Sequence, residues 1–110
     1  MRHAISVDVE DWGQLAVSEQ KKLSDRFERN VGKVLEAFAN HGVKGTFFVL
    51  GFAAESAPNV VKAIANAGHE IQSHGYGHLS NFELDESAFR EDVTRAKKLL
   101  EDIALSLIHI

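Results

Sequence analysis

The chain has 110 residues, 45% hydrophobic and 25% charged, which suits a single globular domain with a modest core. Twelve Lys and Arg against sixteen Asp and Glu give a formal net charge of -4 with no basic block, which argues against a nucleic-acid partner or an anionic membrane surface. There are no cysteines, so any bound metal must be held by His, Asp or Glu. The N-terminal MRHAISVDVEDW contains neither a secretory hydrophobic region nor a membrane span, and we expect a cytoplasmic protein.

Strand and helix patterns alternate from the N-terminus. AISVDVE, residues 4–10, alternates in hydrophobicity and predicts a strand with Ile5, Val7 and Val9 on one side. Residues 24–42 predict an amphipathic helix that ends near Gly42. Its apolar stripe consists of Phe27, Val31, Val34, Leu35 and Phe38.

The middle of the chain repeats this strand and helix order. VKGTFFVLG, residues 43–51, is short, apolar and β-branched, and it predicts a strand buried on both faces with Phe47 and Phe48 in the core. Residues 57–68 predict a short helix with Pro58 at its first position and Gly68 just past its end.

The last pair consists of a strand in GHEIQSH, residues 68–74, and a helix over residues 86–103 with Asp85 as N-cap. Three strand–helix pairs predict an α/β fold, β-α-β-α-β-α, with a parallel sheet. Three strands cannot close a barrel, so the fold looks unfinished. The predicted buried face of the last helix consists of Phe89, Val93, Ala96, Leu100 and Ile103.

Carboxylates and imidazoles gather at the end of the first and third predicted strands. Asp8 and Glu10 are two residues apart and share a face, with Asp11 at the corner beyond. His74 ends the third strand and His78 follows in a loop that contains two glycines. Because the carboxyl ends of parallel strands meet at one rim, we expect these groups to converge.

Two imidazoles and a carboxylate suit zinc or another divalent first-row metal and leave positions open for water and substrate. A second carboxylate could take a proton from metal-bound water. The alternative interpretation is two surface histidines in a polar loop and a solvated acidic strand end. Of the other histidines, His3 and His41 are expected at the opposite rim as surface groups, and His69 is expected to be structural.

The motifs SVDVEDW, GTFFVLG, GHEIQSHGYGH and FREDVTRAKKLLEDI together resemble the first half of a polysaccharide deacetylase. This is the NodB-homology group, carbohydrate esterase family 4, and the acidic motif is closest to its exopolysaccharide-associated branch and similar to the peptidoglycan-deacetylase branch. The resemblance implies the N-terminal half of a distorted (β/α) barrel over residues 1–104, an N-terminal fragment of a longer protein. We expect residues 105–110, LSLIHI, to be a non-native tail.

The resemblance also implies a reaction and the residues for it. Asp8 matches the catalytic base, and His74 and His78 match the metal-binding histidines of a His-x-x-x-His motif. Many members have two adjacent aspartates, whereas Val9 follows Asp8 here, so the metal carboxylate would be Glu10 or Asp11. The implied activity is removal of N-acetyl groups from an N-acetylated polysaccharide or oligosaccharide with a divalent metal, Zn²⁺.

Two parts of the family's site have no counterpart in this sequence: the arginine-proline motif that supports the base, and the late histidine that acts as acid. We therefore expect this fragment to be inactive alone. Two other functions fit the same residues. One is a non-catalytic βα module that binds a sugar or a partner chain, and the other is a small-molecule amidase similar to the allantoinase-like branch.

Overall fold

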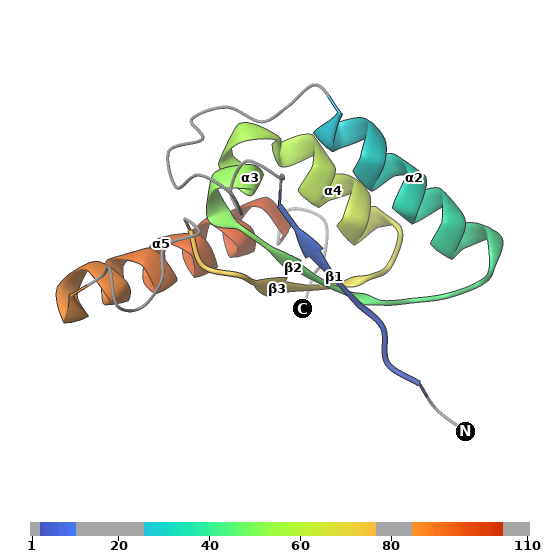
Figure 1. Ribbon diagram of the computed structural model, residues 1–110. Coiled ribbons are helices and arrows are strands. Elements are labelled where there is room, and N and C mark those ends of the chain that lie inside the picture. The colour runs from blue at the N-terminus through green and yellow to red at the C-terminus, as the bar shows by residue number, and fades with distance from the viewer. Residues whose placement is uncertain (1–2, 11–25, 77–84, 105–110) are drawn as a thin grey trace.

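The structure, a computed structural model, describes residues 3–10, 26–76 and 85–104 (Figure 1). These residues form the predicted α/β architecture. The predicted tail at residues 105–110 lies outside the described residues, and the domain boundary at residue 104 stays a prediction. The elements are β1 (Ser6–Val9), α2 (Phe27–Asn40), β2 (Thr46–Val49), α3 (Gly51–Ser56), α4 (Pro58–Asn66), β3 (Glu70–Ser73) and α5 (Glu86–Ala104).

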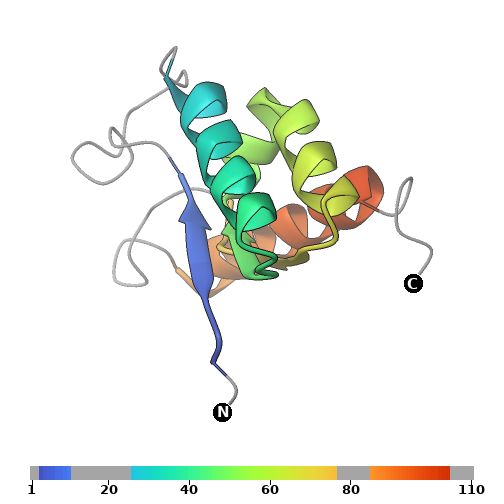
Figure 2. The same ribbon diagram turned by 90° about the vertical axis from the view of Figure 1, so that its right-hand side faces the viewer.

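The three strands form one parallel sheet in the order β1-β2-β3. Val7 pairs with Phe47 and Phe47 with Ile71, and the next row on the same face is Val9, Val49 and Ser73. Figure 2 shows α2 and α4 on the same side of β1. The sheet therefore has one face covered by helices and one face that these helices leave open.

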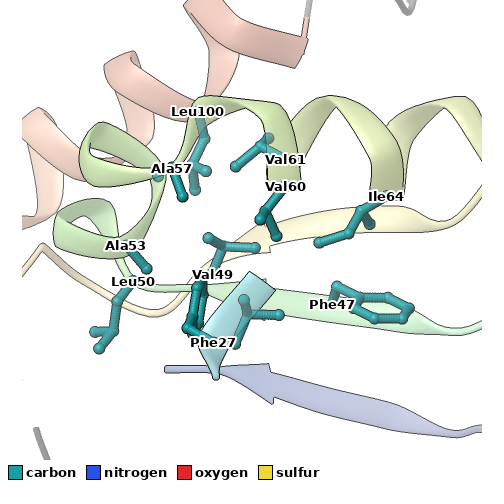
Figure 3. Close-up of a cluster of buried hydrophobic side chains, with 12 residues drawn as sticks. Phe27, Phe47, Val49, Leu50, Ala53, Ala57, Val60, Val61, Ile64 and Leu100 are labelled. Carbon is teal, nitrogen blue, oxygen red and sulfur yellow. The ribbon is translucent and has the colours of Figure 1, made fainter. Parts of the chain in front are cut away.

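The core lies between the covered face of the sheet and the helices. Phe47 and Val49 of β2 are both 0% exposed, and in Figure 3 they lie among side chains of α3 and α4. Phe48, which points to the opposite face, is half-buried. The prediction that β2 is buried on both faces, with Phe48 in the core, is therefore wrong for the described residues, because every helix they form packs on the other face.

Local signals explain most of the helix boundaries. The apolar stripe of α2 packs against the core, and beyond the helix Gly42 adopts φ +63°. The Val43 N–H donates to the Phe38 carbonyl (2.9 Å) and the Gly42 N–H to the Ala39 carbonyl (3.2 Å), which is a Schellman ending. Asp85 caps α5 as predicted, since its Oδ1 accepts from the Ala88 N–H at 2.7 Å.

Two features of the helices differ from the predictions. The six-residue α3 was not predicted, because it is too short to show a helical period. Phe89 and Val93 of α5 are 43% and 41% exposed, whereas Ala96 and Leu100 farther along are buried. The prediction that α5 buries all five of its apolar residues is therefore wrong for Phe89 and Val93. One reason is that β3 is an edge strand of the described sheet, and Ile71 and Val93 line an open pocket of about 720 Å³ instead of packing together.

His69, predicted to be structural, is 4% exposed just before β3. Its Nδ1 accepts a hydrogen bond from the Gly45 N–H at 3.1 Å, and its ring packs against those of Phe38 and Phe47 at centroid distances of 5.5 and 4.8 Å. Burial, and secondarily the charge of Lys44, lowers the pKa of His69 below its ordinary value. The neutral His69 side chain therefore links the residue just before β3 to the residue just before β2.

We expect the free energy of unfolding to decrease as pH falls below about 6.5, the pKa of an unfolded histidine. The folded pKa is lower, so the unfolded state binds more protons, and stability is lost as pH falls toward the folded pKa. His69→Asn places an amide oxygen near the position of Nδ1 and does not titrate, so the decrease should be smaller.

Urea unfolding at a series of pH values measures this, with His41→Asn, which removes an exposed imidazole, as the control. An equal pH dependence in His69→Asn and wild type would contradict the assignment.

Candidate metal site

The acidic end of β1 and the imidazole after β3 lie on the open face of the sheet. Val9 is 2% exposed in the core, so Asp8 and Glu10 on either side of it point to the opposite face. The His74 N–H donates to the Val49 carbonyl at 3.0 Å and extends the β2–β3 ladder by one residue. Glu10 and His74 therefore follow the last paired row of the sheet, on its two edge strands.

The structure brings three of the predicted site residues together. One ligand atom from each of Asp8, Glu10 and His74 lies within 4.8 Å of the other two. Glu10 Oε2 and His74 Nε2 are 3.2 Å apart and shielded from solvent. The Glu10 side chain is 11% exposed and that of His74 31%, whereas Asp8 is exposed. The cluster thus has an inner carboxylate–imidazole contact and an outer carboxylate.

This donor set fits a divalent cation. Carboxylate oxygen and imidazole nitrogen are ligands that zinc and other first-row ions accept. With bonds of about 2.1 Å, two ligand atoms on one ion are at most roughly 4.2 Å apart, close to the 4.8 Å limit of the cluster. Small side-chain movements would therefore let all three residues reach one ion. Two carboxylates at this distance also favour a cation electrostatically.

Asp11 and His78 lie outside the described residues. The structure therefore describes only one of the two candidate metal carboxylates, Glu10, and the choice between Glu10 and Asp11 stays a prediction. The shielded position of Glu10 beside His74 is the arrangement expected of a ligand. The exposed position of Asp8 is the arrangement expected of a group that meets water and substrate. The catalytic and ligand roles of these residues stay predictions.

The residues that surround the loop after β3 were not predicted from the sequence. The Tyr76 N–H donates to Asp92 Oδ2 at 3.0 Å, and the Arg95 guanidinium carbon lies 3.7 Å from the centre of the Tyr76 ring. The Tyr76 hydroxyl donates to Glu55, which also accepts from Arg95 at 3.2 Å. Glu55 and Arg95 are 40 residues apart in the chain, and no local pattern in the sequence indicates their contact.

No helix of the described residues combines the length and the hydropathy that a membrane crossing requires. The predicted absence of a nucleic-acid partner rests on charge alone and stays a prediction.

Comparisons with known proteins agree on one family. Residues 21–108 match the family described as polysaccharide deacetylase. A peptidoglycan-N-acetylglucosamine deacetylase from Bacillus cereus is 40% identical over 72 residues, covering 66% of this chain and 26% of that protein. A chitooligosaccharide deacetylase from Rhizobium leguminosarum bv. trifolii is 29% identical over 69 residues, covering 63% of this chain and 32% of that protein.

A solved structure gives the same result. The crystal structure of the Bc1960 peptidoglycan N-acetylglucosamine deacetylase aligns with a TM-score of 0.72 and 32% identity, covering 92% of this chain and 40% of that one. The chain therefore spans between about a quarter and two fifths of the length of these relatives.

Tyr76 is the chain's one tyrosine, so tyrosinate absorbance reports its ionisation alone. Burial, followed by the hydrogen bond and charge of Glu55, raises the pKa of Tyr76 above its ordinary value, and Arg95 opposes this rise. We expect Glu55→Gln to lower the pKa and Arg95→Met to raise it, as measured by ultraviolet titration. Shifts of the same sign in both variants would contradict the described contacts.

Proposed function

This chain belongs to the polysaccharide deacetylase family, and we propose that it supplies the metal-binding part of an active site that hydrolyses N-acetyl groups on a polysaccharide. The observation that carries this proposal is the convergence of Asp8, Glu10 and His74 within 4.8 Å on the open face of the sheet. N-acetylglucosamine units in peptidoglycan are the substrate named for the Bacillus cereus relative, and we propose a substrate of that class. The cytoplasmic location and the exopolysaccharide association remain predictions.

We propose Glu10 and His74 as ligands of one divalent ion, zinc by preference, joined by His78 from the predicted His-x-x-x-His motif. Their contact of 3.2 Å, shielded from solvent, places an oxygen and a nitrogen side by side as neighbouring ligands require. When bound, the ion would act as a Lewis acid toward an acetyl carbonyl and a water molecule.

Asp8 would be the general base. Its carboxylate lies beside the two ligands but is exposed, so a water molecule held at the cluster could reach it. Asp8 would accept a proton from this water as the water attacks the acetyl carbon. Glu10 and His74 would hold the ion beside Asp8. The leaving sugar amine must also gain a proton. The cluster of described residues holds one imidazole, which this scheme uses as a ligand, so the acid would come from elsewhere in the protein.

Metal titration tests the ligand assignments on the chain as it stands. In calorimetry with ZnCl₂, Glu10→Gln and His74→Ala should each weaken binding by at least about tenfold, since loss of a ligand costs no less than loss of an outer partner. Asp8→Asn should retain most of the affinity, because its proposed role is proton transfer.

His41→Ala removes an exposed imidazole far along the chain from the cluster and serves as the control. Zinc binding that is equally strong in wild type, Glu10→Gln and His74→Ala would place the metal elsewhere and refute the site.

Acetate release tests the reaction. We expect the isolated chain to release no acetate from chitooligosaccharides above the rate with free zinc, because the described residues of the cluster offer no second imidazole to act as the acid. In a full-length protein that contains this segment, Asp8→Asn should lower the rate by roughly 10² to 10⁴-fold while zinc affinity is retained. Metal-independent binding of chitooligosaccharide with no acetate release from the full-length protein would instead favour the sugar-binding module.

A further inference from the structure

The loop that carries His74 is held by the backbone of α3. The Gly51 N–H donates to the Gly75 carbonyl at 2.7 Å, and the Phe52 N–H donates to the Tyr76 carbonyl at 2.9 Å. These donors belong to the first turn of α3, which has no side-chain cap, so the loop satisfies N–H groups that the helix cannot pair internally. Gly75 adopts φ +80°, which lets the chain turn immediately after His74.

The Tyr76 side chain extends this attachment to α5. Its ring lies under the Arg95 guanidinium, its hydroxyl donates to Glu55, and Arg95 bonds the same Glu55 carboxylate at 3.2 Å. The ring also packs on Gly51, where an added Cβ would lie 2.6 Å from Tyr76 Cδ2 and 3.0 Å from its Cα. We refer to Tyr76, Arg95 and Glu55 as the Tyr76 bracket.

We propose that the Tyr76 bracket positions the metal-binding loop, so that His74 faces Glu10 across the sheet before a metal arrives. This inference rests on the proposed function, because it assigns these residues a role toward the same metal site. None of the three residues is a proposed ligand. They act through the backbone of residues 74–76, and they reinforce the three hydrogen bonds that attach this backbone to α3 and α5.

Stabilising the fold as a whole is not the main effect of the bracket. Arg95 and Glu55 are 58% and 50% exposed, and an ion pair exposed to this degree contributes little to global stability. The bracket nevertheless joins the loop to two helices, and it does so two residues after His74. Residues that orient a ligand without touching the metal can still change its affinity.

The matched pair Arg95→Met and Arg90→Met tests the bracket. Both arginines lie on α5 and pair with an exposed glutamate, Arg95 with Glu55 at 3.2 Å and Arg90 with Glu86 at 3.0 Å. In calorimetry with ZnCl₂, Arg95→Met should weaken binding by roughly two- to fivefold, the range that corresponds to the loss of an exposed ion pair. Arg90→Met should bind as wild type, and both variants should keep the wild-type midpoint of urea unfolding.

Substitutions at Tyr76 add a rescue test. Tyr76→Ala should weaken zinc binding at least as much as Arg95→Met, whereas Tyr76→Phe keeps the ring under the guanidinium and should restore most of the affinity. The visible absorption of bound Co²⁺ provides a second readout, because it depends on ligand geometry. Its band should change in Tyr76→Ala and remain as in wild type in Tyr76→Phe.

The outcomes separate this inference from the proposed function. If Glu10→Gln and His74→Ala lose zinc while Arg95→Met and Tyr76→Ala bind as wild type, the bracket has no positioning role and the metal site stands. A loss of affinity in Arg95→Met matched by an equal loss in Arg90→Met would also overturn the bracket. Wild-type zinc binding in His74→Ala and Glu10→Gln would refute the site itself.

Discussion

The candidate site depends on the parallel register of three strands. Val9, Val49 and Ser73 form the last paired row, and the residues that follow on the two edge strands are Glu10 and His74. Strands that flank a common neighbour are separated by two spacings of about 4.8 Å, so their side chains must bridge roughly 10 Å of backbone. Glutamate and histidine are long enough to meet over this gap, and their polar atoms do so at 3.2 Å.

The same register gives the two faces of the sheet different chemistry. Val7, Phe47 and Ile71 lie in one row under the helices, whereas the next row on the open face is Asp8, Phe48 and Gln72. In a (β/α) barrel the face away from the helices lines the interior. A half-buried Phe48 beside polar residues suits a face that further strands of a longer protein would enclose, as the relatives' greater length allows.

Local features of the sequence were sufficient for most of the fold. Gly42 and Asp85 define helix ends through bonds to neighbours in the chain, so their roles could be predicted. Helical periodicity identifies an apolar side but not whether another element covers it, which explains the exposed Phe89 and Val93. For the site, strand ends were enough to predict that Asp8, Glu10 and His74 converge. The Tyr76 bracket joins three separate elements, and no sequence spacing encodes such a contact.

The two carboxylates of the site differ in what surrounds them, although they share a strand face. Glu10 is the longer side chain and reaches inward to His74, where its Oε2 is shielded from water. Asp8, two residues earlier in the chain, is exposed at the edge of the cluster.

A bound cation would compensate the desolvation of Glu10 and its repulsion from Asp8, and would connect the two edge strands through their side chains. Such a cation would bind the folded arrangement and not the unfolded chain. At concentrations above its dissociation constant, it would raise the free energy of unfolding in proportion to the logarithm of the ratio of its concentration to that constant. Metal binding and the order of the strand ends would therefore be thermodynamically coupled.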